Sequence, residues 1–137
     1  MFSELILLSF DKIMQTRAYT VVILSGEDKR FAIYTDPGIG KALQLFLTDV
    51  EKPRPLTHDL IDMIFDGMNI RVKQVVINNV EDTVYYARLF LEQECGDLLQ
   101  IVEIDARPSD CITLALMNNA PVYCTREVLE KTIPVEE

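Results

Sequence analysis

The segment from Asp105 to Leu116 constrains this chain most, because it joins a cluster of charges to a helix that is apolar on nearly every side. Pro108 fixes the φ angle at a helix start, Ser109 can accept a hydrogen bond from a free backbone N–H, and Asp110 places negative charge at the positive end of the helix dipole. The apolar run that follows predicts a buried helix rather than a surface helix. The chain must therefore build its core around this helix.

The start of this helix carries more charge than capping requires. Arg107 precedes the helix, with Asp105 two residues upstream and Asp110 three residues downstream, so we expect one guanidinium and two carboxylates to converge there. A cap needs only one short polar side chain, and Ser109 alone would supply it. The surplus of charge is the functional signal.

Residues 54–60 repeat this arrangement as Arg-Pro-Leu-Thr-His-Asp-Leu. Arg54 and a proline again precede a hydroxyl residue, Thr57, which is expected to cap the next helix, and then Asp59. This segment also holds the only histidine, His58. We expect the two Arg-Pro segments to form neighbouring walls of one water-accessible polar hollow.

The remaining sequence predicts alternating groups of strands and helices. Helical spacing predicts helices over 40–47, 57–66 with Gly67 as C-terminal cap, 108 to about 118, and after Thr125. Runs of consecutive strands between the helices favour a single α+β domain, a mixed and largely antiparallel sheet with helices packed on it. We place this domain at 1–132 and treat 133–137 as a polar tail that frays. The predicted strands cover 5–14, 19–24, 31–35, 70–78, 83–92, 98–104 and 121–124.

Composition limits the partners of this domain. Thirteen basic and 22 acidic residues give a formal net charge of −9, which disfavours long-range attraction to nucleic acid or to an anionic membrane. DNA or RNA would have to meet a local basic patch. The three cysteines have no metal-type spacing, which favours reduced thiols and a cytoplasmic location, with Cys111 in the core. No targeting segment is expected, and the apolar strands favour a homo-oligomer.

The two Arg-Pro segments, with Tyr-Ala-Arg-Leu at 86–89 between them, resemble the bifunctional nuclease domain family of bacteria and plants. The order and spacing of all three motifs match, and the resemblance spans nearly the whole chain. It implies nuclease activity on both DNA and RNA, an attribution known for some members of the family.

Two positions depart from the family pattern. Asp36 and Ile39 stand where members usually carry a Gly and an acidic residue, and Thr83 stands in a turn that usually has Gly. If the missing carboxylate is a metal ligand or a base in active members, the departure at Ile39 predicts a weak or inactive nuclease.

The nuclease hypothesis gives each charged residue a role. His58 would act as general acid or base because its ordinary pKa lies near neutrality, while carboxylates would hold a divalent cation such as Mg or Mn that activates water. Arg54 and Arg107 would neutralise charge on the phosphorane, and Lys52 and Arg88 would guide the nucleic-acid backbone. The predicted catalytic residues are His58, Asp59, Asp105 and Asp110, of which Asp105 and Asp110 would bind the metal.

Two other classes of function compete with catalysis. Arg107 with Asp105, and Arg54 with Asp59, would then be ion pairs that lock two helix starts to the sheet in a non-catalytic, oligomeric interaction module. Alternatively, the two helix N-termini would bind a small anionic metabolite through free N–H groups. A shared cleft favours catalysis or ligand binding, whereas burial under another subunit favours the interaction module.

Overall fold

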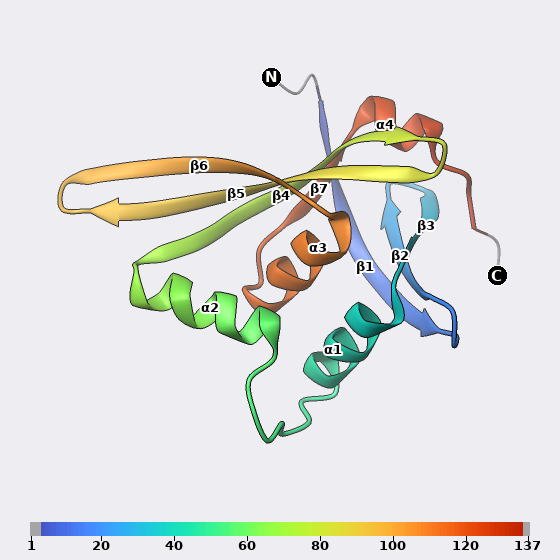
Figure 1. Ribbon diagram of the computed structural model, residues 1–137. Helices are drawn as coiled ribbons and strands as arrows, with labels where there is room; N and C mark the ends of the chain where they lie inside the picture. Colours follow the sequence, from blue (N-terminus) through green and yellow to red (C-terminus); the bar gives the residue numbers. More distant parts are fainter. Residues whose placement is uncertain (1–3, 136–137) are drawn as a thin grey trace.

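The computed structural model describes residues 4–135 as one α+β domain, which confirms the predicted fold class. Seven strands form one mixed sheet in the order β3-β2-β1-β7-β4-β5-β6, and only the β4–β7 pair is parallel. In Figure 1, α1, α2 and α3 are grouped below the strands and α4 lies above them. The strands are β1 (Leu5–Gln15), β2 (Thr20–Gly26), β3 (Lys29–Thr35), β4 (Ile70–Glu81), β5 (Val84–Cys95), β6 (Leu98–Ala106) and β7 (Val122–Thr125).

The predicted strands are all present, and several are longer than the sequence indicated. The connection between β4 and β5 shrinks to Asp82 and Thr83, because β4 continues as far as Glu81, which pairs with Val84. Asp82 and Thr83 both have positive φ, 48° and 69°. Two such residues form the tight hairpin turn whose twist matches the flanking strands.

Helix α1 (Pro37–Leu47) starts earlier than predicted, and helix α2 (Thr57–Gly67) is capped differently from the prediction. Asp36 caps α1 by accepting a hydrogen bond from the Ile39 N–H at 3.0 Å, so α1 begins three residues before position 40. Thr57 does not cap α2; the Asp59 carboxylate accepts from the backbone N–H of Leu56 at 2.8 Å instead. Gly67 is still helical rather than the C-terminal cap.

Helix α3 (Pro108–Met117) starts without a side-chain cap, so the expected role of the Ser109 hydroxyl is wrong. Ser109 is buried, and its carbonyl accepts from the Thr113 hydroxyl at 2.8 Å. The prediction for α4 (Arg126–Lys131) is correct, because the Thr125 hydroxyl accepts from the Val128 N–H at 3.2 Å. Two of the three hydroxyl caps expected from the sequence are therefore absent.

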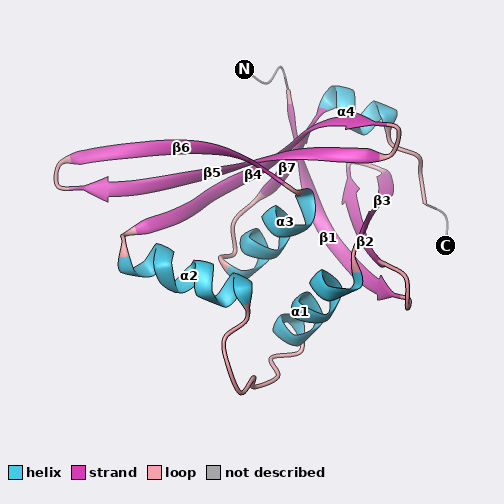
Figure 2. Cartoon of the chain, viewed as in Figure 1, coloured by secondary structure: helices cyan, strands magenta, loops and turns pink. Residues whose placement is uncertain are grey.

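Helix α3 is buried along most of its length, as its apolar sequence predicted. It lies against the sheet and packs on β4 and β5 (Figure 2). The inward residues Val75, Ile77 and Ala87 of these strands are fully buried. Cys111 lies in this core as expected, and burial raises the pKa of its thiol to about 12. The three cysteines are free thiols, with Cys95 exposed and Cys124 buried. Strand β6 leads directly into α3, so the sheet fixes where this helix begins.

The C-terminal segment runs back along the edge strand β3. The backbone N–H of Val135 donates to the carbonyl of Arg30 at 2.9 Å. The rest of the predicted tail, residues 136–137, and the start of the chain, residues 1–3, lie outside the described residues.

Candidate functional site

The first turns of α1, α2 and α3 face a shared hollow of about 650 Å³, which we call the α1–α3 hollow. Each helix N-terminus presents backbone N–H groups and the positive end of a helix dipole. Three such ends around one opening make a local environment suited to an anion, despite the acidic charge of the whole chain. The hollow is lined by Asp36, Gly38, Ile39, Lys41, Ala42, Leu45, Pro55, Leu56, Thr57, His58, Arg107 and Asp110.

The two Arg-Pro segments meet in this hollow through His58 and Asp110. His58 Nε2 lies 3.0 Å from Asp110 Oδ1, although the two residues are 52 positions apart in the sequence. His58 is buried, with 7% of its surface exposed, and Asp110 is partly buried. The structure therefore brings the histidine of α2 against the first turn of α3.

Arg107 holds the same carboxylate from the other side. Its Nε donates to Asp110 Oδ2 at 2.8 Å and its Nη2 to Asp110 Oδ1 at 3.2 Å, a two-pronged pairing that fixes both groups. Its Nη1 donates to Asp36 Oδ2 at 3.3 Å. These contacts use three of the five N–H donors of the guanidinium, whose side chain remains 61% exposed.

Asp36 is the second carboxylate at Arg107, the place where the sequence analysis expected Asp105. One oxygen of Asp36 caps α1 and the other contacts Arg107, so this residue links the starts of α1 and α3. Sequence reasoning missed this role because it placed Asp36 in a break between the strand 31–35 and a helix that begins at position 40. An Asp before Pro at a helix start was the available signal.

The network favours the ionised form of Asp110. Burial opposes the charge, but hydrogen bonds from Arg107 and His58 outweigh this cost and keep the pKa of Asp110 below its ordinary value. The same pairing with Asp110 raises the pKa of Arg107. Ionised Asp110 can only accept a hydrogen bond, so this contact requires a proton on Nε2 of His58, and the tautomer that fits has Nδ1 as its acceptor nitrogen.

Asp59 lies on α2 next to His58 but does not line the hollow. Its carboxylate accepts from the Leu56 N–H and contacts Lys52 Nζ at 2.9 Å, and these two partners, in that order, lower the pKa of Asp59. The anticipated pairing of Asp59 with Arg54 is wrong, since Lys52 takes that place. Arg54 is exposed and lies outside the lining of the hollow.

Asp105 and Arg88 lie on the sheet rather than in the hollow. They face each other across β5 and β6, with Arg88 Nη1 3.7 Å from Asp105 Oδ1 and Arg88 Nε 2.8 Å from Glu103 Oε2. The expected convergence of Asp105 with Arg107 is wrong because Asp105 still belongs to β6, where its register directs it to Arg88. Its side chain is 70% exposed.

The side chains of the hollow do not form a ready metal site. Among residues 4–135, no three His, Cys, Asp or Glu side chains are grouped as metal ligands. Asp36 and Asp110 are both bound by the Arg107 guanidinium, whose positive charge stands where a cation would have to bind both carboxylates. Asp105 and Asp110, the predicted metal pair, belong to separate networks.

Comparison with known proteins assigns the chain to a family. Residues 21–136 match the bifunctional nuclease domain. The chain belongs to the bifunctional nuclease domain family. It is 31% identical over 102 residues to an uncharacterized protein of Mycobacterium tuberculosis, covering 74% of this chain and 58% of that protein.

Plant relatives of the domain are more distant. Bifunctional nuclease 1 of Arabidopsis thaliana is 30% identical over 84 residues, which is 61% of this chain and 26% of the plant protein. Bifunctional nuclease 1 of Oryza sativa subsp. indica is 27% identical over 82 residues, 60% of this chain and 24% of that protein. The chain therefore spans little more than half of the mycobacterial relative and about a quarter of the plant proteins.

Ile39, one of the positions that depart from the family pattern, lies in the wall of the α1–α3 hollow. Ile39 is 9% exposed and lies in the first turn of α1, so an apolar side chain stands where the family pattern has an acidic residue. Together with Ala42 and Leu45 it makes the α1 wall apolar. The cationic groups of the hollow, Arg107 and Lys41, therefore face one carboxylate fewer than that pattern would provide.

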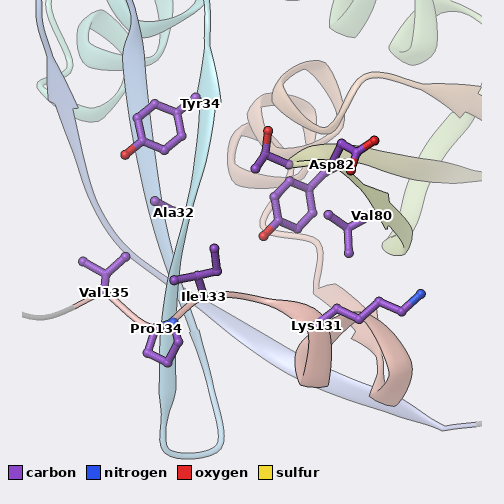
Figure 3. Close-up of a pocket in the computed structure, with 10 residues that line it drawn as sticks. Ala32, Tyr34, Val80, Asp82, Lys131, Ile133, Pro134 and Val135 are labelled. Carbon is purple, nitrogen blue, oxygen red and sulfur yellow. The ribbon is translucent and has the colours of Figure 1, made fainter.

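The departure at Thr83 lies at a different hollow, of about 560 Å³, between β3, the β4–β5 turn and the C-terminal segment (Figure 3). None of the predicted site residues lines it. Figure 3 shows Tyr34 and Ile133 on one side of this space and Val80 and Asp82 on the other. The family's Gly suits the positive φ of this turn, whereas Thr83 adopts the same conformation with a β-branched side chain.

No helix within residues 4–135 is both long enough and apolar enough to cross a membrane.

Proposed function

We propose that this domain is a nuclease that hydrolyses phosphodiester bonds of DNA and RNA in the α1–α3 hollow. The observation that carries the proposal is the contact of His58 with Asp110 at 3.0 Å, beside a two-pronged Arg107, where three helix N-termini converge. An imidazole that is oriented by a carboxylate can transfer a proton, and a guanidinium can stabilise negative charge on a phosphate. The names of the plant relatives support the same reaction.

Arg107 is the proposed phosphate-binding residue. Two of its five N–H donors are not used by Asp36 or Asp110, and its exposed side chain leaves them accessible to a phosphate oxygen. Lys41 lines the same hollow and adds a second cation. The positive ends of three helices reinforce this pair, so a phosphate meets local attraction in a chain with a net charge of −9.

His58 is the proposed general base. Asp110 fixes the proton on Nε2 and so leaves Nδ1 to take a proton from an attacking water. As the water oxygen bonds to phosphorus, the bond from phosphorus to the leaving sugar oxygen breaks, and that oxygen takes a proton from solvent. Arg107 holds Asp110 from the opposite side, which keeps the carboxylate from rotating away from the imidazole. Arg107 therefore both stabilises negative charge on the phosphorane and fixes the group that orients the base.

Mg or Mn belongs to the proposal only as a condition to be tested. A divalent cation would need Arg107 to release Asp36 or Asp110, because these carboxylates are already paired. The other cations predicted from the sequence, Arg54, Lys52 and Arg88, lie outside the lining of the hollow, so their contribution is limited to guiding a long substrate.

A small-anion-binding site is the second candidate, and the same three helix N-termini favour it. A binding site needs Arg107 and the helix ends but no base. The histidine is therefore the residue that separates the two functions: replacing it should abolish hydrolysis while leaving anion affinity nearly unchanged.

The deciding experiment is a nuclease assay on single-stranded DNA and RNA, run with EDTA, Mg and Mn. His58→Ala should lower kcat by roughly 10²–10⁴-fold, the usual loss of a general base. Arg107→Ala should lower kcat/KM at least as much. Arg54→Ala is the matched control, an exposed arginine of the equivalent Arg-Pro segment outside the hollow, and should stay near wild type.

Equal activity in wild type, His58→Ala and Arg107→Ala would indicate a contaminating nuclease and reject the site. Loss of activity with Arg54→Ala but not Arg107→Ala would place the chemistry outside the hollow. Absence of hydrolysis under every metal condition, with retained phosphate affinity that depends on Arg107, would replace the nuclease by the anion-binding function.

A further inference from the structure

Strand β6 is one of the two edge strands of the sheet, and it is exposed along nearly its whole length. Its residues from Leu98 to Asp105 are all exposed, yet the strand is rich in large aliphatic side chains. A soluble domain usually buries such side chains or scatters them singly. The exposed fractions are 69% for Leu98, 53% for Leu99, 55% for Ile101, 45% for Val102 and 39% for Ile104, and we call these five residues the β6 edge.

The two edges of the sheet are protected differently. Edge strand β3 carries Lys29 and Arg30, and the C-terminal segment covers part of it through the Val135 to Arg30 hydrogen bond. Strand β6 has no lysine, arginine or proline, and its ladder with β5 runs without a bulge. Charges, prolines and bulges are what keep an edge strand from pairing with another chain, and the stretch of β6 from Leu98 to Val102 has none of them.

A second apolar surface borders the β6 edge. Helix α2 exposes about half of each of four apolar side chains, and its C-terminal turn is tied to the end of β5. Gln93 Nε2 donates to the Met68 carbonyl at 3.0 Å, and Asp66 of α2 and Leu99 of β6 line one small hollow. Figure 1 shows α2 and the β5–β6 hairpin in the same half of the molecule. The four side chains are Leu60, Met63, Ile64 and Met68.

We infer that β6 pairs antiparallel with β6 of a second copy of this chain, around a two-fold axis that passes beside Gln100. In this register Leu98 faces Val102 of the partner and Leu99 faces Ile101, so apolar side chains meet apolar side chains on both faces. The two Gln100 side chains face each other and can hydrogen-bond through their amides. A two-fold axis makes one self-complementary strand sufficient for both halves of the interface.

Neighbouring registers are less favourable. Centring the pair on Ile101 would place Leu99 opposite Glu103, and centring it on Val102 would place Leu99 opposite Asp105. In the Gln100 register the stretch from Leu98 to Val102 pairs only with itself, and Glu103, bound to Arg88 at 2.8 Å, comes opposite Asp97 of the second copy, in the turn before β6. The uncharged stretch of β6 therefore sets both the partner and the register.

The size of the apolar surface suits a second copy. Nine side chains, five on β6 and four on α2, are each about half exposed, which corresponds to on the order of 500 Å² of aliphatic surface per copy. The strand backbone and the polar rim add to this, and a standard stable interface needs roughly 800 Å² per partner. Glu92, Glu94 and Asp97 border the β5–β6 tip and disfavour nucleic acid as the occupant.

Sedimentation velocity tests the pairing on the full chain. Wild type should sediment as a dimer of 15.7 kDa subunits at micromolar concentration, and both Leu99→Lys and Ile101→Lys should sediment as folded monomers with unchanged circular dichroism. Val84→Lys is the matched control, because Val84 is a 56% exposed β5 residue at the other end of the hairpin, and it should remain dimeric.

A cross-link tests the register. In a Cys95→Ser background, Gln100→Cys should form a disulfide between copies, since directly opposed residues of antiparallel strands have Cα atoms roughly 4.5–5.5 Å apart. Leu98→Cys faces Val102 of the partner and should not cross-link to itself. Cys111 and Cys124 are buried and should not interfere.

A monomeric wild type at all concentrations up to about 100 μM would overturn the inference, a concentration at which even weak association is populated. So would an oligomer that survives both lysine variants, or one that cross-links through Leu98→Cys but not through Gln100→Cys. Activity plays no part in these readouts, so the pairing stands or falls independently of the proposed nuclease.

Discussion

The β6 edge and the α1–α3 hollow are built from adjacent parts of the chain, but their side chains are held in opposite ways. On β6, aliphatic side chains are exposed and stabilised only by neighbours in the ladder. A few residues later, two hydrogen bonds join Arg107 to Asp110, one joins Arg107 to Asp36 and one joins Asp110 to His58. The hollow is organised by contacts within one chain, whereas the edge is the surface that we propose a second copy completes.

The comparison also explains why two aspartates on either side of Arg107 behave differently. Asp105 lies on the last part of β6, exposed and 3.7 Å from Arg88, whereas Asp110 lies in the first turn of α3 with several partners. Neighbouring carboxylates thus differ because one follows the alternation of a strand and the other follows the turn of a helix. Substitution of Asp110 should therefore change the free energy of unfolding more than substitution of Asp105 does.

The largest expected effect follows from Asp110→Ala. It removes the shared acceptor of His58 and Arg107 in a partly buried position and should lower the free energy of unfolding by about 2–3 kcal/mol. Asp105→Ala is the matched control and should change it by less than about 0.5 kcal/mol, because the carboxylate is exposed. Urea unfolding measures both. Equal losses in the two variants would remove the distinction between hollow and edge.

A smaller effect is expected for the coupling between individual side chains. A double-mutant cycle of His58→Ala and Asp110→Ala should give a coupling energy of about 1–2 kcal/mol, because the two groups are in contact and shielded from water. The cycle of Arg88→Ala with Asp105→Ala should give less than about 0.5 kcal/mol. A larger coupling energy for the pair on the sheet than for the pair in the hollow would contradict the stronger organisation of the hollow.

Local sequence patterns predict most of the helices and strands and the meeting of His58 with Asp110. They do not predict the contact of Asp36 with Arg107. The apolar run of α3 and the alternation of β5 identified buried elements correctly, and the repeated Arg-Pro segments placed His58 near Asp110. Asp36 was missed because it is 71 residues from Arg107, a separation that no periodicity relates. The hydroxyl cap expected at Thr57 is absent because the nearby carboxylate of Asp59 accepts from the Leu56 N–H at the α2 start instead.

Acidification should lower the free energy of unfolding through protonation of Asp110. The loss should be smaller than the loss caused by Asp110→Ala. The pKa of Asp110 lies below its ordinary value of 3.8, so its contribution is complete above that pH and is lost as the pH falls through the lower, folded-state pKa. The difference in unfolding free energy between wild type and Asp110→Asn should therefore shrink as the pH falls below about 4. Denaturant titrations at each pH measure this difference. A difference that grows on acidification would reverse the assigned direction.

The smallest effect is expected at the two turns of the exposed hairpins, where backbone conformation rather than side-chain contact sets the energy. Thr83 has a φ of 69°, so Thr83→Gly should stabilise the fold by about 0.5–1 kcal/mol, the relief of strain being partly offset by the greater freedom of Gly in the unfolded chain. Gly96→Ala makes the opposite change at a φ of 62° in a turn where an added Cβ meets no atom within 4 Å, so steric contact cannot contribute. It should destabilise by about 1 kcal/mol. Thermal unfolding of both variants, followed below the concentration at which copies associate, isolates the backbone effect. If both substitutions changed the stability in the same direction, side-chain contacts rather than φ would control the energy of these turns.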